Sequence, residues 1–259
     1  DITKSYGPVS VLKGVSFSVA PGEVIGFVGH NGAGKSTLLK VFSGEHHASG
    51  GRLRLNGEEV SFSSPQEPIA AGISTVYQEL SLLPNLTVTQ NVWLGQELSG
   101  TTGLKLNEMR EGAKALVDKF GLDVDVDRKV GAYPVATRQR LEIAIAASRD
   151  TKCLLLDEPT TSLEGEQVVE LMTYLRGLAD QEGIGIVLVN HKLDELYSVA
   201  DRVVALMDGR IVLDEDVATV NRDDVITAIA GEGALYVDVR DDVADLGPRV
   251  PWFFARDLK

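Results

Sequence analysis

The sequence is poor in cysteine, in the glycine and proline of low-complexity chains, and in long apolar runs. Its single cysteine, Cys153, cannot form a disulfide within the chain, and its place in the apolar run 153–156 predicts a buried thiol in a reducing compartment. The 26 glycines and 9 prolines among 259 residues are too few for a collagen-like or linker-like protein. The longest apolar stretches, such as 184–189, fall well short of the roughly 18 residues that cross a bilayer, so no membrane span is expected.

The start of the chain lacks the basic residues and the apolar stretch of a signal peptide. It also lacks an initiator methionine, which is compatible with a fragment of a longer protein. Basic residues are in short supply, because 25 Lys and Arg face 38 Asp and Glu, for a net charge of −13. That charge repels phosphate backbones, so no nucleic-acid partner is expected. The hydrophobic content of 44% is enough for a sizeable core, and the length fits one large α/β domain with an insertion or two small domains.

The order of apolar patterns predicts an α/β fold. A strand at 24–28 leads through a glycine-rich loop into a helix, and Asn56-Gly57 predicts an antiparallel hairpin in the N-terminal part. Helical spacing dominates residues 86–147, which we interpret as a helical insertion. Further on, the pattern predicts strands that alternate with helices: strands at 153–156, 184–189 and 202–206, and helices at 167–179 and 193–200. Asp208-Gly209 then predicts another hairpin turn. Such alternation is typical of a parallel sheet whose carboxyl strand ends bind ligands.

Residues 29–36 match the phosphate-binding pattern G-x-x-x-x-G-K-[ST], with the required strand before and helix after it. In this pattern glycines let backbone N–H groups turn toward phosphate, the lysine supplies a cation, and the hydroxyl can ligate Mg²⁺. The alternative is an ordinary glycine-rich turn. The candidate nucleotide-binding residues here are Gly29, Asn31, Gly32, Ala33, Gly34, Lys35, Ser36 and Thr37.

Two carboxylates, Asp157 and Glu158, follow the apolar strand 153–156. A parallel sheet would present them beside the glycine-rich loop. There Asp157 can hold Mg²⁺ together with Ser36, and Glu158 can accept a proton from the water that attacks the γ-phosphorus. Taken alone, the pair could equally be a solvated strand end.

Together these residues resemble the ATP-binding cassette (ABC) ATPases, a P-loop NTPase family with a RecA-like parallel sheet core, an N-terminal antiparallel β-subdomain and an inserted helical subdomain. Tyr6, the loop 29–37, Gln78, Asp157-Glu158-Pro159-Thr160 and His191 occur in the family's order. The resemblance implies that Tyr6 stacks on adenine, that Gln78 reaches Mg²⁺ or the attacking water, and that His191 contacts the γ-phosphate. By itself each of these three residues could be an ordinary turn or strand-end side chain.

The segment from Gly72 to Gly95 resembles the carbohydrate-uptake branch of the family, whose subunits energise import of ribose, xylose, galactose and similar sugars. Such subunits usually carry two cassettes in one chain. We therefore expect an ATPase domain at 1–230, an acidic linker beyond it, and the start of a second cassette near Trp252, within 231–259. The resemblance implies ATP and Mg²⁺ as cofactors. It implies as partners a second cassette, a transmembrane permease and, indirectly, a substrate-binding protein, at the cytoplasmic face of the membrane.

The family's signature, L-S-G-G-Q, is replaced here by residues 133–137, Tyr-Pro-Val-Ala-Thr, before a helix expected to begin near Arg138. Pro134 offers neither the hydroxyl nor the N–H of the family's serine. Glu164 also stands where the family has aspartate. Since each cassette of the family completes the other's ATP site, we expect asymmetric hydrolysis, with this chain's own P-loop the more active.

The leading interpretation is an ABC importer ATPase. One alternative is a non-transport cassette acting on the ribosome or on DNA, although such proteins usually have the basic arms or coiled coils that this sequence lacks. Another is an unrelated P-loop kinase, which would not need Gln78, the signature region and His191.

Overall fold

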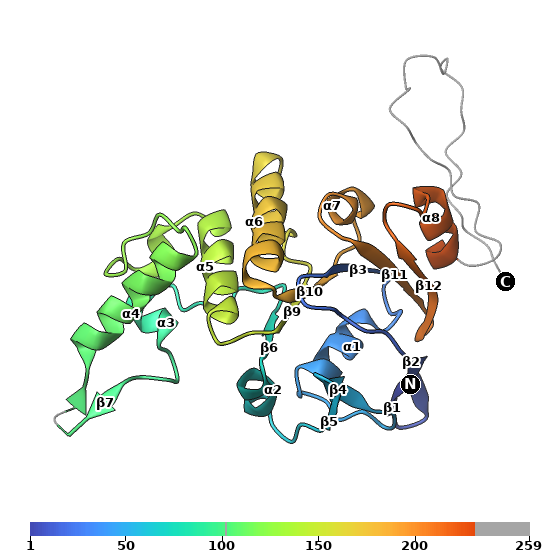
Figure 1. Cartoon of the computed structure of the whole chain (residues 1–259), viewed down its shortest axis with the longest axis horizontal. Helices are drawn as coiled ribbons and strands as arrows, with labels where there is room; N and C mark the ends of the chain where they lie inside the picture. The colour runs from blue at the N-terminus through green and yellow to red at the C-terminus, as the bar shows by residue number, and fades with distance from the viewer. Residues whose placement is uncertain (102, 231–259) are drawn as a thin grey trace, which may run out of the picture.

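The computed structural model describes residues 1–101 and 103–230, and its centre is a six-stranded sheet (Figure 1). The sheet order is β12-β11-β3-β10-β9-β6, and every pair is parallel except β11 with β12. The strands are β3 (Val24–Val28), β6 (Ile73–Val76), β9 (Cys153–Asp157), β10 (Gly185–Val189), β11 (Arg202–Met207) and β12 (Arg210–Asp216). The α/β fold with a parallel core is therefore confirmed, as is the hairpin turn at Asp208-Gly209.

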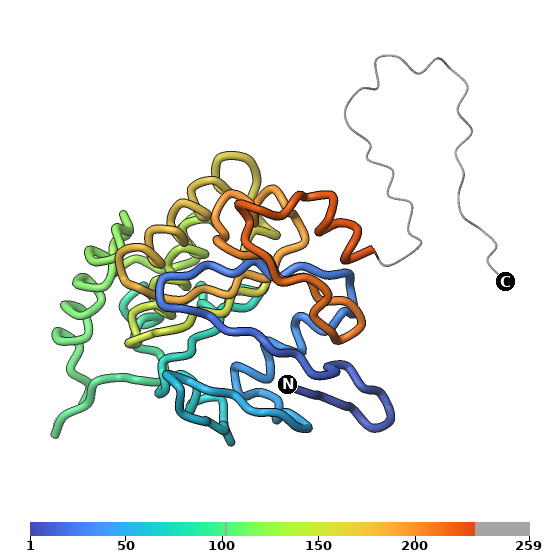
Figure 2. The backbone as a smooth tube through the Cα atoms, turned by 45° about the vertical axis from the view of Figure 1, so that its right-hand side comes forward, coloured from blue at the N-terminus to red at the C-terminus, as the bar shows by residue number. Residues whose placement is uncertain are grey.

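Helices cover both faces of this sheet, as Figures 1 and 2 show. Leu155 of β9 packs in the cluster that holds α1 (Lys35–Phe42), whereas Leu154 and Leu156 pack in the cluster of the opposite face. The helices of that opposite face are α5 (Val135–Ala147), α6 (Glu166–Glu182) and α7 (Leu193–Tyr197). Because side chains alternate along a strand, a strand buried on both faces needs the continuous apolar run that β9 has. Cys153, at the start of β9, is half-buried rather than fully buried, and burial raises its pKa to about 12.

The N-terminal part is antiparallel. Strand β1 (Ile2–Tyr6) pairs with β2 (Val9–Val15), and β4 (Leu53–Leu55) pairs with β5 (Glu58–Val60). Asn56 and Gly57 both adopt positive φ, at 53° and 85°, which is the backbone of a tight two-residue hairpin and confirms that turn. Helix α2 (Gln66–Ala71) follows. This helix was not predicted, because it is short and contains a proline.

Residues 86–147 contain α3 (Val88–Val92), α4 (Leu106–Lys119), a short 3₁₀ turn (Val130–Ala132) and α5 (Figure 1). Two features differ from the expectation. A small hairpin of β7 (Ser99–Gly100) and β8 (Gly103–Leu104) interrupts the helices. Helix α5 begins at Val135 rather than near Arg138, because the Arg138 N–H already donates to the Pro134 carbonyl in a helical hydrogen bond of 3.0 Å.

After β12 the described chain ends with α8 (Arg222–Ala230), whose first turn carries two acidic residues that suit a helix N-terminus. The predicted linker and the predicted start of a second cassette lie outside the described residues, and the domain boundary at 230 stays a prediction. Within the described ranges, none of the helices combines the length and the apolar character that crossing a membrane requires.

Candidate nucleotide site

The candidate site residues come together because several strand ends share one edge of the sheet. Strands β3, β10, β9 and β6 are parallel neighbours, so the segments that follow them emerge side by side. The glycine-rich loop follows β3, Gln78 follows β6, Asp157 and Glu158 end β9, and His191 follows β10. The topology thus places on one edge residues that are far apart in the sequence.

The glycine-rich loop needs glycine at two positions for different reasons. A Cβ on Gly29 would collide with the carbonyl oxygen of Leu206 in β11, so only glycine permits this close approach. Gly34 has φ +110°, a conformation that L side chains rarely adopt, and it turns the chain into α1. The first helical bond recorded here runs from the Leu38 N–H to the Gly34 carbonyl, so the N–H groups of the first turn remain available to an anion.

Lys35 lies inside the loop with 7% of its surface exposed. Its Nζ donates to the carbonyl oxygens of Gly29 at 2.6 Å and of His30 at 3.2 Å. Burial lowers the pKa of Lys35, whereas the carboxylates of Glu158 and Asp157 act in the opposite direction. The ammonium group is therefore held in the concavity where the pattern predicts phosphate.

Asp157 and Ser36 meet across the space between β9 and α1. Burial raises the pKa of Asp157, a hydrogen bond from the Ser36 side chain lowers it, and the charge of Glu158 raises it again. Across residues 1–101 and 103–230, no three His, Cys, Asp or Glu side chains gather into a group that could hold a metal ion. A hydroxyl and a single carboxylate are nevertheless the kind of oxygen donors that Mg²⁺ uses when phosphates complete its shell.

Glu158 adopts φ +48°, in the left-handed region that non-glycine residues usually avoid. Backbone hydrogen bonds to the neighbouring segments hold it there. Its N–H donates to the Val189 carbonyl at 2.9 Å, and its own carbonyl accepts from the Thr161 hydroxyl at 3.0 Å. This turn directs the carboxylate toward His191, whose Nδ1 lies 3.5 Å from Oε2 of Glu158. A strained conformation with defined partners is typical of functional positions.

The structure also shows how the two loops after β9 and β10 are tied together, which sequence analysis missed. Asn190 donates from Nδ2 to the Thr160 hydroxyl at 3.1 Å and to Oε2 of Glu195 at 2.7 Å, and Thr160 donates to the same carboxylate oxygen at 2.5 Å. Thr160 and Asn190 are almost fully buried. This network fixes the backbone beside Glu158 and His191. Its only sequence signal is polar residues next to apolar strands, which is not specific.

Gln78 and Tyr6 have looser surroundings. Gln78 is exposed two residues after β6. The Tyr6 ring lies at the turn end of the β1–β2 hairpin, 5.6 Å from the His46 ring, with Lys4 Nζ 4.9 Å from its centroid. The ring is 42% exposed, so it is accessible to a ligand, but its recorded ring contacts are not with the glycine-rich loop.

The signature-equivalent residues 133–137 form the link into α5 and its first residues. The Tyr133 hydroxyl accepts from the Asp125 N–H at 2.7 Å and donates to the Asp125 carbonyl at 3.2 Å. The Arg128 guanidinium lies 5.0 Å from the Tyr133 ring centroid. Tyr133 is therefore committed to internal contacts, whereas Pro134 is the residue before the first helical turn.

Comparison with known proteins agrees with this arrangement. The family model described as ABC transporter matches residues 12–161, and the chain belongs to that family. It is 40% identical to the ribose import ATP-binding protein RbsA 3 of Rhizobium meliloti over 230 residues, which cover 89% of this chain and 45% of that protein. It is 39% identical to a putative ribose/galactose/methyl galactoside import ATP-binding protein of Agrobacterium fabrum, covering 89% of this chain and 46% of that protein.

Among solved structures, a nucleotide-free ATP-binding cassette from an ABC transporter superposes with a TM-score of 0.76 at 26% identity, covering 89% of this chain and 97% of that one. The resemblance of the sequence to this family is therefore confirmed, and the curated relatives are named for ribose and galactose import. The chain spans about half the length of the curated relatives it matches.

Proposed function

We propose that the edge of the sheet described above is a Mg²⁺-dependent ATP site. The loop amides and Lys35 would bind the β- and γ-phosphates, and the Ser36 hydroxyl, the Asp157 carboxylate and Gln78 would hold the ion. The bound ion would neutralise charge on the phosphates. The exposed Tyr6 ring is the candidate platform for adenine. What supports this set is the buried Lys35 ammonium group, which the Gly29 and His30 carbonyls hold inside the glycine-rich loop.

Within this site, Glu158 would accept the proton of the attacking water, and His191 would orient the γ-phosphate. A base acts only when it is held within reach of its proton. The left-handed backbone of Glu158, the Thr160–Asn190–Glu195 network and the 3.5 Å approach of His191 all serve that positioning.

For the whole protein we propose the ATP-hydrolysing subunit of an ABC importer for a sugar. The curated relatives are named for ribose and galactose import, and the solved neighbour is a transporter cassette. A second cassette, in the same longer chain or in a dimer, and a transmembrane permease at the cytoplasmic face of the membrane would complete the machine. A substrate-binding protein would then act through the permease.

The decisive experiment is the Glu158→Gln variant. Removing a positioned general base reduces turnover by about 10²–10⁴-fold, while the amide retains the size and most contacts of the side chain. We expect Mg²⁺-dependent ATP affinity to stay within about threefold of the wild type and hydrolysis to fall at least ~100-fold. Affinity is measured with a fluorescent ATP analogue and turnover by phosphate release, in the presence of the partner cassette.

The matched control is Glu170→Gln, an exposed glutamate on α6. It should leave both affinity and turnover unchanged. Unimpaired hydrolysis in Glu158→Gln would remove Glu158 from the catalytic role, and absence of Mg²⁺-dependent ATP affinity in the wild type would overturn the nucleotide site itself.

A further inference from the structure

The segment that carries Gln78 leaves the sheet at its edge. Strand β6 is the last of the six strands and pairs only with β9 in the described part of the chain, and this ladder ends at Val76 opposite Leu156. No backbone–backbone hydrogen bond is recorded for residues 77–80 within the described ranges. Contacts other than the sheet must therefore hold Gln78 in place.

Two side-chain contacts flank Gln78. After it, the Ser81 N–H donates to Oε1 of the buried Glu142 in α5 at 2.9 Å. Before it, the Tyr77 hydroxyl donates to the Glu45 carboxylate and lies 3.1 Å from the Ser43 hydroxyl. Burial and the Glu45 contact raise the pKa of Tyr77 to about 12, so this hydroxyl keeps its proton and remains a donor at neutral pH.

The contact before Gln78 joins it to the helix that begins in the glycine-rich loop. Ser36 lies in the first turn of α1, and Ser43 is the cap residue at the other end of the same helix. The charge of Asp157 also acts on the Tyr77 hydroxyl. One helix thus carries a candidate Mg²⁺ ligand at its start and a partner of Tyr77 at its end, so it relates the position of the Gln78 segment to that of Ser36.

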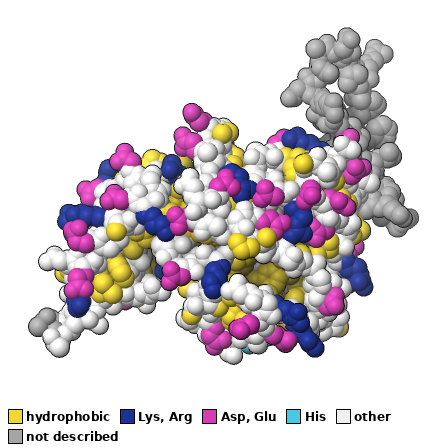
Figure 3. Space-filling view, in the orientation of Figure 1, with side chains coloured by type: hydrophobic (Ala, Val, Ile, Leu, Met, Phe, Trp, Pro, Cys, Tyr) yellow, Lys and Arg dark blue, Asp and Glu magenta, His cyan; other side chains and the backbone are white. Residues whose placement is uncertain are grey.

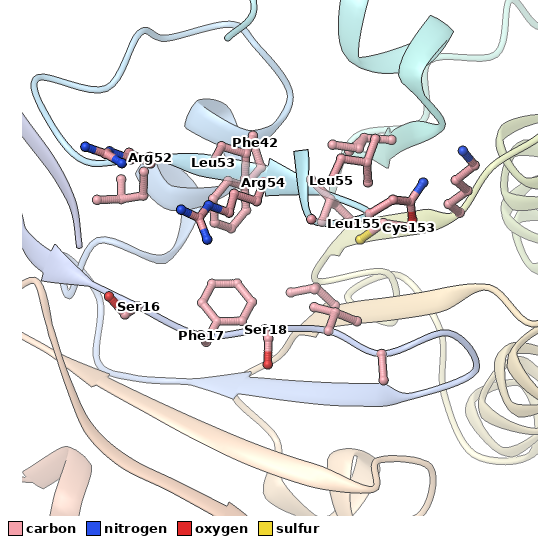
Figure 4. Close-up of a pocket in the computed structure, with 18 of the residues that line it drawn as sticks. Ser16, Phe17, Ser18, Phe42, Arg52, Leu53, Arg54, Leu55, Cys153 and Leu155 are labelled. Atoms are coloured by element: carbon pink, nitrogen blue, oxygen red, sulfur yellow. The ribbon is translucent and has the colours of Figure 1, made fainter. Parts of the chain in front are cut away.

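Helix α1 is itself packed firmly against the sheet. Figure 3 shows hydrophobic side chains in a hollow near the middle of the visible face, where Figure 1 places α1 and β4. Phe42, the last residue of α1, lies in one apolar cluster with Leu155 of β9, and both line the pocket drawn in Figure 4. Because close-packed interiors resist compression, the end of α1 is a fixed point from which the Tyr77 side chain is held.

We propose that Tyr77 is a positioning residue whose hydroxyl, held at the end of α1 by Glu45 and Ser43, keeps Gln78 within reach of the Mg²⁺ ion. Tyr77 acts through Gln78 and does not touch the nucleotide. A carboxylate acceptor makes this hydrogen bond charge-assisted and therefore stronger than one between neutral groups. The inference rests on the proposed role of Gln78 in the ATP site and names the contact that sets its position.

Tyr77→Phe tests the proposal, because it removes the hydroxyl and keeps the ring. Residues that orient metal ligands typically change metal affinity or activity by about 10–100-fold. In the chain assembled with its partner cassette, we expect kcat to fall about tenfold and the Mg²⁺ concentration for half-maximal turnover to rise about tenfold. Affinity for a fluorescent ATP analogue without Mg²⁺ should stay within about twofold of the wild type, because the glycine-rich loop is unchanged.

A double-mutant cycle with Gln78→Ala tests whether Tyr77 acts through Gln78. Gln78→Ala alone should reduce kcat and weaken the Mg²⁺ dependence at least as much as Tyr77→Phe does. Adding Tyr77→Phe to Gln78→Ala should cost less than about twofold more, because there is then no amide side chain left to position. A merely structural hydroxyl would instead give the same loss in both backgrounds.

The matched control is Tyr197→Phe in α7. Its hydroxyl also donates one hydrogen bond, to the Val220 carbonyl at 3.3 Å, so the two variants lose the same kind of group. Tyr197→Phe should change Tm about as much as Tyr77→Phe does but leave kcat and the Mg²⁺ dependence unaltered. Glu45→Gln keeps an oxygen acceptor for Tyr77 and should retain most of the turnover, whereas Glu45→Ala should lose it.

Two results would overturn the positioning role while leaving the ATP site intact. One is wild-type kcat and Mg²⁺ dependence in Tyr77→Phe when Gln78→Ala lowers kcat, and the other is an equal loss from Tyr77→Phe with and without Gln78. Wild-type kcat in Gln78→Ala would instead show that the proposed role of Gln78 is wrong, and the positioning role would fall with it. The Gln78→Ala measurement therefore separates the two failures.

Discussion

Lys35 shows how a single buried charge would prepare the proposed phosphate site. Its ammonium group is satisfied by two carbonyl oxygens of its own loop, and burial makes the charged form costly. A bound phosphate would therefore pair with this ammonium group without displacing a full shell of bulk water from it. The loop carbonyls and the incoming oxygens compete for the same three donors of the lysine.

Replacing this side chain should weaken nucleotide binding strongly. A hydrogen bond to a charged group contributes about 1.5–3 kcal/mol, so Lys35→Ala is expected to raise the Kd for ATP by roughly 10–100-fold. Titration with a fluorescent ATP analogue measures the change. Lys114→Ala, on the exposed face of α4, is the control and should leave the Kd unaltered. An unchanged Kd in Lys35→Ala would mean that the lysine does not face the phosphates.

Among single residues, the sequence predicted the groups that carry a local pattern and missed those that depend on distant contacts. Gly29 to Thr37 and the pair Asp157 and Glu158 follow from short motifs next to strands. The left-handed backbone of Glu158 and the Asn190–Glu195 contact arise only when two strand ends lie side by side. No short pattern encodes that proximity, because the residues are separated by an entire helix.

At the scale of elements, α5 is connected to the segment after β6 by one buried carboxylate. Glu142 of α5 is 6% exposed, and its Oε1 accepts a hydrogen bond of 2.9 Å from the Ser81 N–H and another from the Ser81 hydroxyl. Its other oxygen has no partner among the described residues. Ser81 lies three residues after Gln78, so this contact joins the candidate Mg²⁺ segment to the helix that begins at the signature region.

The unpaired oxygen makes stability depend on pH. Burial raises the pKa of Glu142, and the hydrogen bonds from Ser81 only partly oppose this. A carboxyl group whose pKa is higher in the folded protein than in the unfolded chain stabilises the folded state at low pH. This stabilisation is complete below the pKa of the unfolded chain and is lost as the pH rises through the pKa of the folded protein. We therefore expect the Tm of Glu142→Gln relative to wild type to increase by roughly 2–4 °C between pH 5 and pH 8.

Thermal unfolding of both proteins at the two pH values measures this difference. Glu170→Gln removes an exposed charge from α6 and should show the same Tm difference at pH 5 and pH 8. A Tm difference between Glu142→Gln and wild type that does not change with pH would show that other contacts in the folded protein offset the cost of burying this carboxylate charge.

Elements were predictable where periodicity and turn residues agree. Strands β3, β9, β10 and β11 and the two hairpin turns follow from apolar runs and from Asn-Gly and Asp-Gly pairs. The core strand β6 was not predicted, because it is short and two of its four residues are polar. The start of α5 was misplaced because Pro134 and Val135 are poor helix formers by propensity. The Arg138-to-Pro134 hydrogen bond nevertheless begins the helix there.

At the scale of the whole molecule, one cation ties the core sheet to its covering helices. Arg176 of α6 donates to the Gly22 carbonyl at 2.7 Å and to Asp201 at 2.9 Å. Asp201 in turn accepts from the Val24 N–H at the start of β3. The strand that leads into the glycine-rich loop is thereby anchored to α6. The second cassette that we propose would therefore meet a frame in which β3 and α6 are joined.

That second cassette leads to the final prediction, which concerns two unequal ATP sites. Residues 133–137 would complete the site on the partner's P-loop. Pro134 has no N–H and no hydroxyl, so this completion relies on the free N–H groups of the first turn of α5 and on the Thr137 hydroxyl. The chain's own site would use the partner's signature instead.

Glu158→Gln is therefore expected to remove most of the turnover, at least about tenfold, while the matching change in the partner costs less than about threefold. Phosphate release by the assembled pair, with each change alone and with both, measures the two contributions. Introducing Pro134→Ser should restore a donor and raise the partner site's share, whereas equal losses from the two single changes would refute the asymmetry.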